Sequence, residues 1–203
     1  MKTTAIKTAV IAAILLLQAC STYRPSAMDD ACKIFGDHKK WYKQARHSTE
    51  KYGTPIATQL AFIYQESRFK DNARPPRTTF LGFIPGPRKS DAYGYAQVKD
   101  DTWQWYKSKA GVWGVDRDDF GDTVLFVGWY NQQSQKQLGI GLGDAYNQYL
   151  AYHEGHGGYK RKTYTKKPSL IAVAKKVSVR AQMYQRQITH CEKELNSSGF
   201  WFF

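Results

Sequence analysis

The chain has 203 residues, a formal net charge of +13 and an aromatic fraction of 15%. This length fits one globular domain with short appendages and leaves enough chain to bury a substantial core. The aromatic content fits either a packed helical core or a groove that stacks on flat substrates. In a cytoplasmic protein the positive charge would favour a nucleic acid partner, an interpretation that the N-terminal segment argues against.

The N-terminal segment is typical of an export signal. Lys2 and Lys7 precede an apolar run at residues 9–17, which is too short to span a bilayer comfortably. The run leads into Ala19-Cys20 and resembles a bacterial lipoprotein signal. The resemblance implies cleavage before Cys20, lipidation of its thiol and, because Ser21 follows, sorting to the outer membrane. We therefore expect a lipid-anchored protein that faces the periplasm, where its acidic partners would be the cell-wall polymer, lipid head groups and lipopolysaccharide.

A short polar tether at residues 20–30 leads into the first predicted helix, which carries one apolar stripe. The stripe consists of Ala31, Ile34, Phe35, His38, Trp41, Tyr42 and Ala45. Gly53 marks a break, and a second helix follows over residues 54–69. Thr54 is expected as its N-cap and Pro55 at its first helical position.

Glu66 lies near the end of this second helix, at the edge of the apolar face that Ile63 and Phe69 share. Partial burial there would raise the pKa of the carboxyl group and make it a usable proton donor near neutrality. The alternative is a solvated glutamate at a helix end.

Residues 72–90 contain turn and breaker signals around the apolar sequence Phe80-Leu81-Gly82-Phe83-Ile84. A long loop in a compact domain is usually functional or disordered. We interpret it as an insertion that borders a cleft, with basic residues that meet acidic substrate groups. A merely solvated loop is the alternative.

Caps, apolar stripes and glycine stops predict four further helices. They run from a cap at Asp100 or Asp101 to Gly111, from Asp116 to Gly139, from Asp144 through Tyr152, and from Pro168 to Cys191. No stretch shows convincing alternation with a period of two, so the predicted fold class is mainly α. With Cys20 assigned to lipid, Cys32 and Cys191 form an even pair. In an oxidising compartment they favour a disulfide between the first and last helices, with two buried free thiols as the alternative.

Three motifs occur in order along the chain. They are Glu66-Ser67-x-Phe69, Ser90-x-Ala92-x-Gly94-Tyr95-Ala96-Gln97-Val98 and Ala151-Tyr152-His153-Glu154-Gly155. Their order and spacing resemble the catalytic domain of lytic murein transglycosylases, the soluble-lytic-transglycosylase (SLT) branch of the lysozyme superfamily, over roughly residues 52–188. The small lipoprotein members are the most similar. The resemblance implies a single lysozyme-like helical domain of goose-lysozyme type with a cleft, at residues 31–196, after a signal peptide at 1–19 and a tether at 20–30. An aromatic tail at 197–203 would follow.

The resemblance also implies roles for individual residues. Glu66 would be the single catalytic acid and base, with Ser67 supporting it by a hydrogen bond. The other substrate-binding positions would be Ser90, Gly94, Tyr95, Ala96, Gln97 and Tyr152. Gln97 would donate or accept a side-chain hydrogen bond, while Tyr152 would orient Glu66 or the substrate. Family members commonly have Leu-Met in place of Tyr95-Ala96, and Asn-Ala in place of His153-Glu154.

The implied reaction is cleavage of the β-1,4 bond between N-acetylmuramic acid and N-acetylglucosamine, with formation of a 1,6-anhydro end and no cofactor. The partners would be peptidoglycan glycan strands and the membrane, but no nucleic acid. A hydrolytic muramidase becomes the better interpretation if Asp91 or Glu154 faces Glu66 as a second carboxylate. A wall-binding lipoprotein without turnover is a third candidate.

Two further groups of residues have alternative interpretations. His153 and His156 stand at i and i+3 rather than the i and i+4 of a zincin helix, so no metal is expected. Four aromatic residues are either sugar platforms or core: Trp103, Trp129, Tyr130 and Tyr159.

Overall fold

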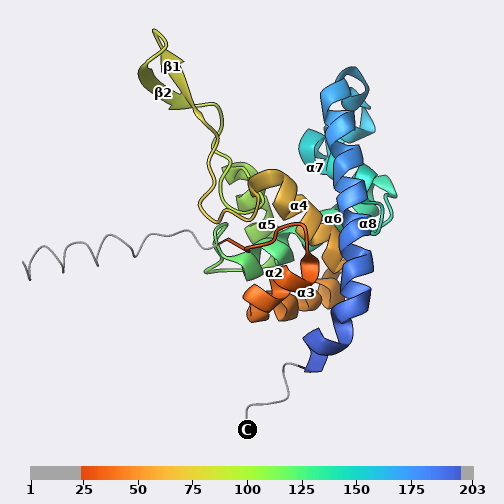
Figure 1. The fold of residues 1–203 in the computed structure, drawn as a ribbon. Coiled ribbons are helices and arrows are strands. Elements are labelled where there is room, and N and C mark those ends of the chain that lie inside the picture. The colour runs from red at the N-terminus through yellow and green to blue at the C-terminus, as the bar shows by residue number, and fades with distance from the viewer. Residues whose placement is uncertain (1–23, 198–203) are drawn as a thin grey trace, which may run out of the picture.

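The computed structural model describes residues 24–197, which form seven α-helices, one short 3-10 helix and a two-stranded hairpin (Figure 1). The helices are α2 (Ala31–Asp37), α3 (Lys39–Tyr52), α4 (Ile56–Ser67), α5 (Asp100–Ala110), α6 (Phe120–Leu138), α7 (Ala145–Lys160), η2 (Thr163–Lys166) and α8 (Pro168–Ser197). The expected signal peptide, the lipidation site at Cys20 and the aromatic residues of the tail lie outside the described residues. Within residues 24–197, no helix combines the length and the apolar character needed to cross a bilayer. The predicted mainly helical class is confirmed.

The long C-terminal helix α8 packs against α2, α4 and α7. It buries one side, as the period of its apolar residues predicts. The buried members are Leu170, Ala174, Val177, Ala181, Tyr184, Ile188 and Cys191. Basic residues such as Lys175 and Lys176 occupy the opposite, exposed side. One amphipathic helix therefore forms a wall along the whole domain.

Helix α4 is buried over most of its length. Every residue from Ala57 to Ile63 is buried, because α3, α6 and α8 all contact this helix. Gln59, in its first half, is buried too, and its amide donates hydrogen bonds to the carbonyl of Thr54 (2.9 Å) and the hydroxyl of Thr49 (3.0 Å). The end of α4, where Glu66 lies, is thus held by a rigid core.

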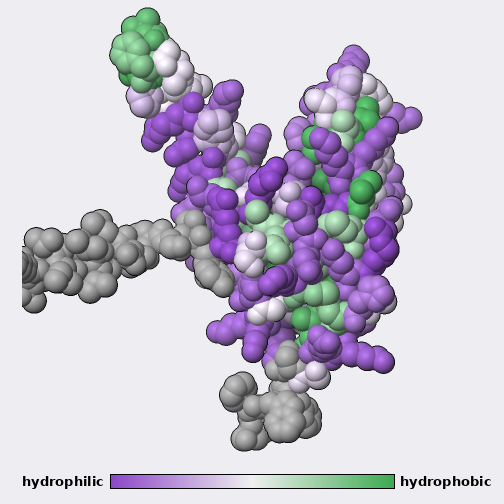
Figure 2. Space-filling model, viewed as in Figure 1, coloured by the Kyte–Doolittle hydropathy of each residue, from purple (hydrophilic) through white to green (hydrophobic). Residues whose placement is uncertain are grey.

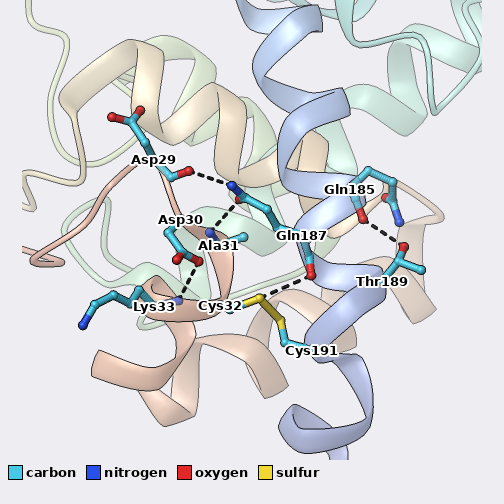
Figure 3. Close-up of a disulfide and its surroundings, with 9 residues drawn as sticks. All are labelled: Asp29, Asp30, Ala31, Cys32, Lys33, Gln185, Gln187, Thr189 and Cys191. Carbon is cyan, nitrogen blue, oxygen red and sulfur yellow. Dashed lines mark hydrogen bonds between the residues drawn. A yellow bond between two sulfur atoms is a disulfide. The ribbon is translucent and has the colours of Figure 1, made fainter.

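The N-terminal segment is fastened to α8 by a disulfide and by hydrogen bonds (Figure 3). Cys32 and Cys191 are bonded, which confirms the predicted disulfide over a sequence separation of 159. The side chain of Gln187 accepts from the backbone N–H of Ala31 and donates to the carbonyl of Asp29, both at 2.9 Å. The hydroxyl of Tyr184 donates to the carbonyl of Met28. The first and last elements of the domain therefore form one unit.

Two helix starts differ from the sequence-based expectations. The predicted first helix is divided at His38 (φ −131°, ψ 71°) into α2 and α3, although its stripe still faces the core. Thr54 is not the N-cap of α4, a position that Pro55 occupies. The hydroxyl of Thr54 instead donates to the carbonyl of Gly128 (3.4 Å) on α6. The prediction was wrong because the hydroxyl that would cap the helix makes this long-range hydrogen bond instead.

The segment predicted as an irregular loop forms a β-hairpin. Strands β1 (Arg77–Phe80) and β2 (Ile84–Arg88) are antiparallel, with Thr79 opposite Pro85 and Phe80 opposite Ile84. Figure 1 shows this hairpin projecting away from the helical body. The sequence shows no alternation here because nearly every strand residue is exposed, so neither face of the hairpin is selected to be apolar.

Candidate active site

A cleft of about 640 Å³ lies between the base of the hairpin, the segment at 92–102 and α7. Figure 2 shows the surface hollowed between the projecting hairpin and the part of the molecule that carries α7 and α8. The lining residues are Glu66, Pro75, Pro76, Ala92, Gln97, Val98, Lys99, Thr102, Phe126, Tyr130, Tyr152, His153, Glu154 and Gly155. A second groove of about 570 Å³ between α4 and α8 contains no carboxylate among its lining residues. Of these two, the first cleft is the one that offers carboxyl groups for acid–base chemistry.

Glu66 occupies the last turn of α4 and contributes to the wall of the cleft. Burial of the carboxyl group raises its pKa to about 7 from an ordinary value of 4.5, because the charged form loses hydration. A hydrogen bond from Tyr149 opposes this shift but does not cancel it. One turn earlier, Phe62 is fully buried against the rings of Tyr149 (5.3 Å) and Tyr152 (5.4 Å). The carboxyl group can thus carry a proton at neutral pH, as its apolar setting predicts.

Two tyrosines of α7 interact with Glu66, whereas the sequence predicts that Tyr152 alone orients Glu66 or the substrate. Tyr149 provides the hydrogen bond to Glu66. Tyr152 lies close enough for the charge of Glu66 to raise its pKa further, beyond the effect of burial. Its hydroxyl, however, donates to the carbonyl of Ala96 at 2.6 Å. Sequence reasoning missed Tyr149, although its position one turn before Tyr152 on the same helix face was a usable signal.

The segment around Gly94 is a buried support for the cleft. Gly94 has a φ of +81°, and its N–H donates to the carbonyl of Ala73 at 3.0 Å. Tyr95 points into the core, where its ring contacts Trp41 (5.8 Å) and Phe120 (5.9 Å) edge-on. Gly94, Tyr95 and Ala96 are all buried and absent from the cleft lining. The structure therefore gives these three residues packing contacts behind the cleft wall, and their contacts with sugar stay a prediction.

Gln97 does line the cleft, but its amide group is already engaged. The Nε2 group donates to the carbonyls of Ala73 (2.8 Å) and Gly94 (3.0 Å). The two serines predicted for the site also bond locally. The hydroxyl of Ser67 donates to the carbonyl of Ile63 (3.2 Å) in its own helix, and Ser90 accepts from the N–H of Ala92 at 3.4 Å. Of the predicted binding residues, Gln97 and Tyr152 are the ones that join Glu66 in the cleft.

Substitution of Gly94 by alanine is expected to destabilise the cleft wall strongly. A Cβ atom at this position would lie 2.0 Å from the carbonyl oxygen of Arg117, and φ is in the left-handed region. Gly111 provides a matched control, since its φ is +63° but nothing lies within 4 Å of an added Cβ. We expect Gly111→Ala to lower the unfolding free energy by about 1 kcal/mol and Gly94→Ala by more than about 3 kcal/mol. Chemical denaturation measures both; equal losses would show that the contact with Arg117 has no effect.

Glu154 is the other carboxylate in the cleft lining, and it is fully engaged. Its side chain is only 3% exposed, and Lys167 forms an ion pair with Oε1 at 2.7 Å. Thr163 donates to Oε2, and Nδ1 of His153 lies 3.2 Å from Oε1. These partners, with Lys167 first, lower the pKa of Glu154 to about 2. Asp91 is exposed and is not part of the cleft lining.

The remaining sequence candidates take structural positions. Within residues 24–197, no three His, Cys, Asp or Glu side chains gather where they would hold a metal ion. His156 lies 2.9 Å from the hydroxyl of Ser134 and stacks on Tyr130 at 4.6 Å. Trp103 and Trp129 are buried in the core. Tyr130 is also buried but contributes to the cleft, whereas Tyr159 is half-buried and stacks on Tyr164 at 5.2 Å.

Comparison with known proteins identifies the family of the chain. The family model described as the transglycosylase SLT domain matches residues 8–191. A search of curated proteins and a search of solved structures each returned no match. The family match spans most of the chain and includes every residue of the cleft. The chain belongs to the transglycosylase SLT domain family.

Proposed function

We propose that the protein is a peptidoglycan lytic transglycosylase that cleaves the bond between N-acetylmuramic acid and N-acetylglucosamine. The observation that carries this proposal is the carboxyl group of Glu66, which lies half-buried in the wall of a cleft of about 640 Å³ and has a pKa raised to about 7. Membership of the SLT family supports a glycan substrate. A pKa near ambient pH suits a group that must give and then take one proton.

In the first step, protonated Glu66 donates its proton to the glycosidic oxygen, and the bond from this oxygen to the anomeric carbon of the muramyl residue breaks. The acetamido group of the substrate stabilises the positive charge on that carbon. Glu66, now a carboxylate, accepts the proton of the muramyl 6-hydroxyl. The 6-oxygen then bonds to the anomeric carbon and closes the 1,6-anhydro ring. Glu66 regains its proton, and no water is consumed.

The contacts of Glu154 argue against hydrolysis by two carboxylates. A hydrolytic muramidase needs a second carboxylate that acts on water or on the sugar. The Lys167 ion pair and the Thr163 hydrogen bond occupy both oxygens of Glu154 and hold its pKa near 2. A carboxylate of such low pKa is a weak base. Glu154 is therefore better suited to fixing the start of η2 against α7 than to activating water.

The proposed location follows from the N-terminal pattern described above. A lipid on Cys20 would hold the enzyme on the outer membrane, facing the periplasm where its substrate lies. Both the lipid and the location are part of the proposal.

Product analysis tests the reaction. Digestion of purified peptidoglycan is expected to release fragments with 1,6-anhydro-muramic ends, which mass spectrometry distinguishes from reducing ends by the loss of one water. Glu154→Gln is expected to release the same anhydro products, because Glu154 takes no part in bond cleavage. Reducing-end muramic acid as the main product would replace the proposal with hydrolysis. Sedimentation with the sacculus but no released fragments would favour a wall-binding protein.

A further inference from the structure

The tip of the β1–β2 hairpin exposes large apolar side chains. The exposed fractions are 66% for Phe80, 68% for Leu81, 75% for Phe83 and 43% for Ile84. Figure 2 shows these residues as a green cap on the end of a projection whose stem is largely polar. Contiguous exposed apolar surface of this kind normally marks an interaction site.

The backbone conformation at the tip disfavours one of the apolar residues found there, Leu81. Leu81 and Gly82 have positive φ angles of 53° and 80°. They occupy the centre of a turn closed by the hydrogen bond from the N–H of Phe83 to the carbonyl of Phe80 (3.3 Å). Asn, Asp or Gly is preferred at such positions, and leucine is strained there. Leu81 buries little within the protein in return, so its side chain is better explained by a contact outside the chain.

The stem of the hairpin is basic. Arg77 and Arg88 face each other across the strands, and Arg74 and Lys89 flank them, whereas residues 72–90 contain no Asp or Glu. Arg77 and Arg88 donate to the carbonyls of Gly86 (3.3 Å) and Pro75 (2.6 Å), which leaves their positive charge uncompensated. Among the ion pairs of residues 24–197, none involves this stem. An apolar tip above a basic stem is complementary to a membrane surface that contains anionic lipid.

We propose that the hairpin tip, Phe80 to Ile84, inserts into the interface of a membrane that contains anionic lipid, while the basic stem contacts lipid phosphates. Pro85 and Pro87 lack a backbone N–H, so β2 is a poor partner for a strand of another chain. A fluid bilayer interface accepts such a tip from all sides.

Insertion of the hairpin would set how the cleft faces its substrate, which the proposed reaction leaves open. Pro75 and Pro76 at the base of the hairpin also line the cleft. An inserted tip would hold the cleft about one hairpin length from the lipid surface. A lipid on the N-terminal segment would tether the protein, but the hairpin would orient it.

Depth-dependent quenching tests insertion separately from tethering. A fluorophore is attached to Leu81→Cys, and in a second protein to Gln182→Cys on the exposed side of α8. Both proteins begin at residue 20, the expected start of the mature chain, and carry Cys20→Ser, so that neither a lipid nor the apolar run at residues 9–17 binds the vesicles. Vesicles contain phosphatidylethanolamine with phosphatidylglycerol and nitroxide-labelled acyl chains. We expect a blue shift and quenching of the label at Leu81 but neither change at Gln182. Absence of both changes at Leu81, or the same changes at both positions, would overturn the proposal.

Vesicle partitioning gives a second readout with a matched control. Phe83→Ser should weaken binding to anionic vesicles about tenfold, since burial of one large apolar side chain is lost. Val179→Ser on α8, which is 65% exposed, should leave binding unchanged. Arg77→Gln combined with Arg88→Gln should weaken binding by about tenfold on anionic vesicles and have little effect on phosphatidylcholine alone. Self-association without lipid that Phe83→Ser abolishes would identify a second copy as the occupant and refute the membrane assignment.

Discussion

Replacement of Glu66 by glutamine is expected to reduce the release of glycan fragments from peptidoglycan by a hundredfold to ten-thousandfold. Glutamine keeps the shape of the side chain but cannot donate or accept the proton that cleavage and ring closure exchange. The rate of appearance of soluble anhydro fragments measures the effect. Asp91→Asn is a matched control, because Asp91 is exposed outside the cleft lining and should retain full activity. Equal activity of Glu66→Gln and the wild type would rule out Glu66 as the acid and base.

The same variant should change the pH dependence of stability. Glu66 has a pKa of about 7 in the folded protein and 4.5 as the ordinary value. Between these two values the folded state binds more protons than the unfolded state, so stability falls as pH rises through this range. The loss amounts to about 3 kcal/mol when complete above pH 7. Glu66→Gln lacks this loss and should therefore be more stable than the wild type above pH 7, with the advantage disappearing below pH 4.5. Urea unfolding at several pH values measures it, and a constant difference would contradict the raised pKa.

Removal of the disulfide by Cys32→Ala and Cys191→Ala together is expected to lower the unfolding free energy by about 5 kcal/mol. The bond closes a loop with a sequence separation of 159, so it restricts the unfolded chain over nearly the whole domain. The double variant avoids leaving a lone thiol that would form disulfides between molecules. Urea unfolding under oxidising conditions measures the difference.

The matched control for this prediction is the wild type in the presence of reductant. Reduction should lower the stability of the wild type to that of the double variant and leave the double variant unchanged. A double variant as stable as the oxidised wild type would mean that the hydrogen bonds of Gln187 and Tyr184 hold the N-terminal segment to α8 without the disulfide.

Patterns that repeat along a helix made most of the fold predictable. The stripe of α8 and the glycine at the end of α6 correspond to the observed burial and to the left-handed Gly139. Such features depend on neighbours three or four positions away, which a single sequence displays. The hairpin was not predictable, because its exposed strands carry no alternation to detect.

The site was predictable in its centre and less so in its periphery. The apolar face of α4 left Glu66 open between a buried and a solvated position. The three motifs and the family they resemble singled it out, and the structure places it in the cleft with a raised pKa. The partners of the side chains around it depend on contacts between distant segments. The hydrogen bond from Tyr152 to Ala96 joins α7 to the loop before α5, 56 residues earlier in the chain. The ion pair of Glu154 with Lys167 joins two residues that lie 13 positions apart, on either side of η2. The types of these residues do not by themselves indicate either partner.

The position of α8 at the C-terminal end has a consequence for the order of folding. Helix α4 has its buried residues covered in part by α8, and the segment from Met28 to Cys32 is bonded to α8 through the hydroxyl of Tyr184, the side chain of Gln187 and the disulfide. Synthesis of the chain from its N-terminus presents α8 after all the other described helices. Until then α4 keeps an apolar side open to solvent, and Cys32 has no native partner within reach. Completion of the core and formation of the disulfide thus both wait for α8, and the chain is most exposed to aggregation before α8 is in place.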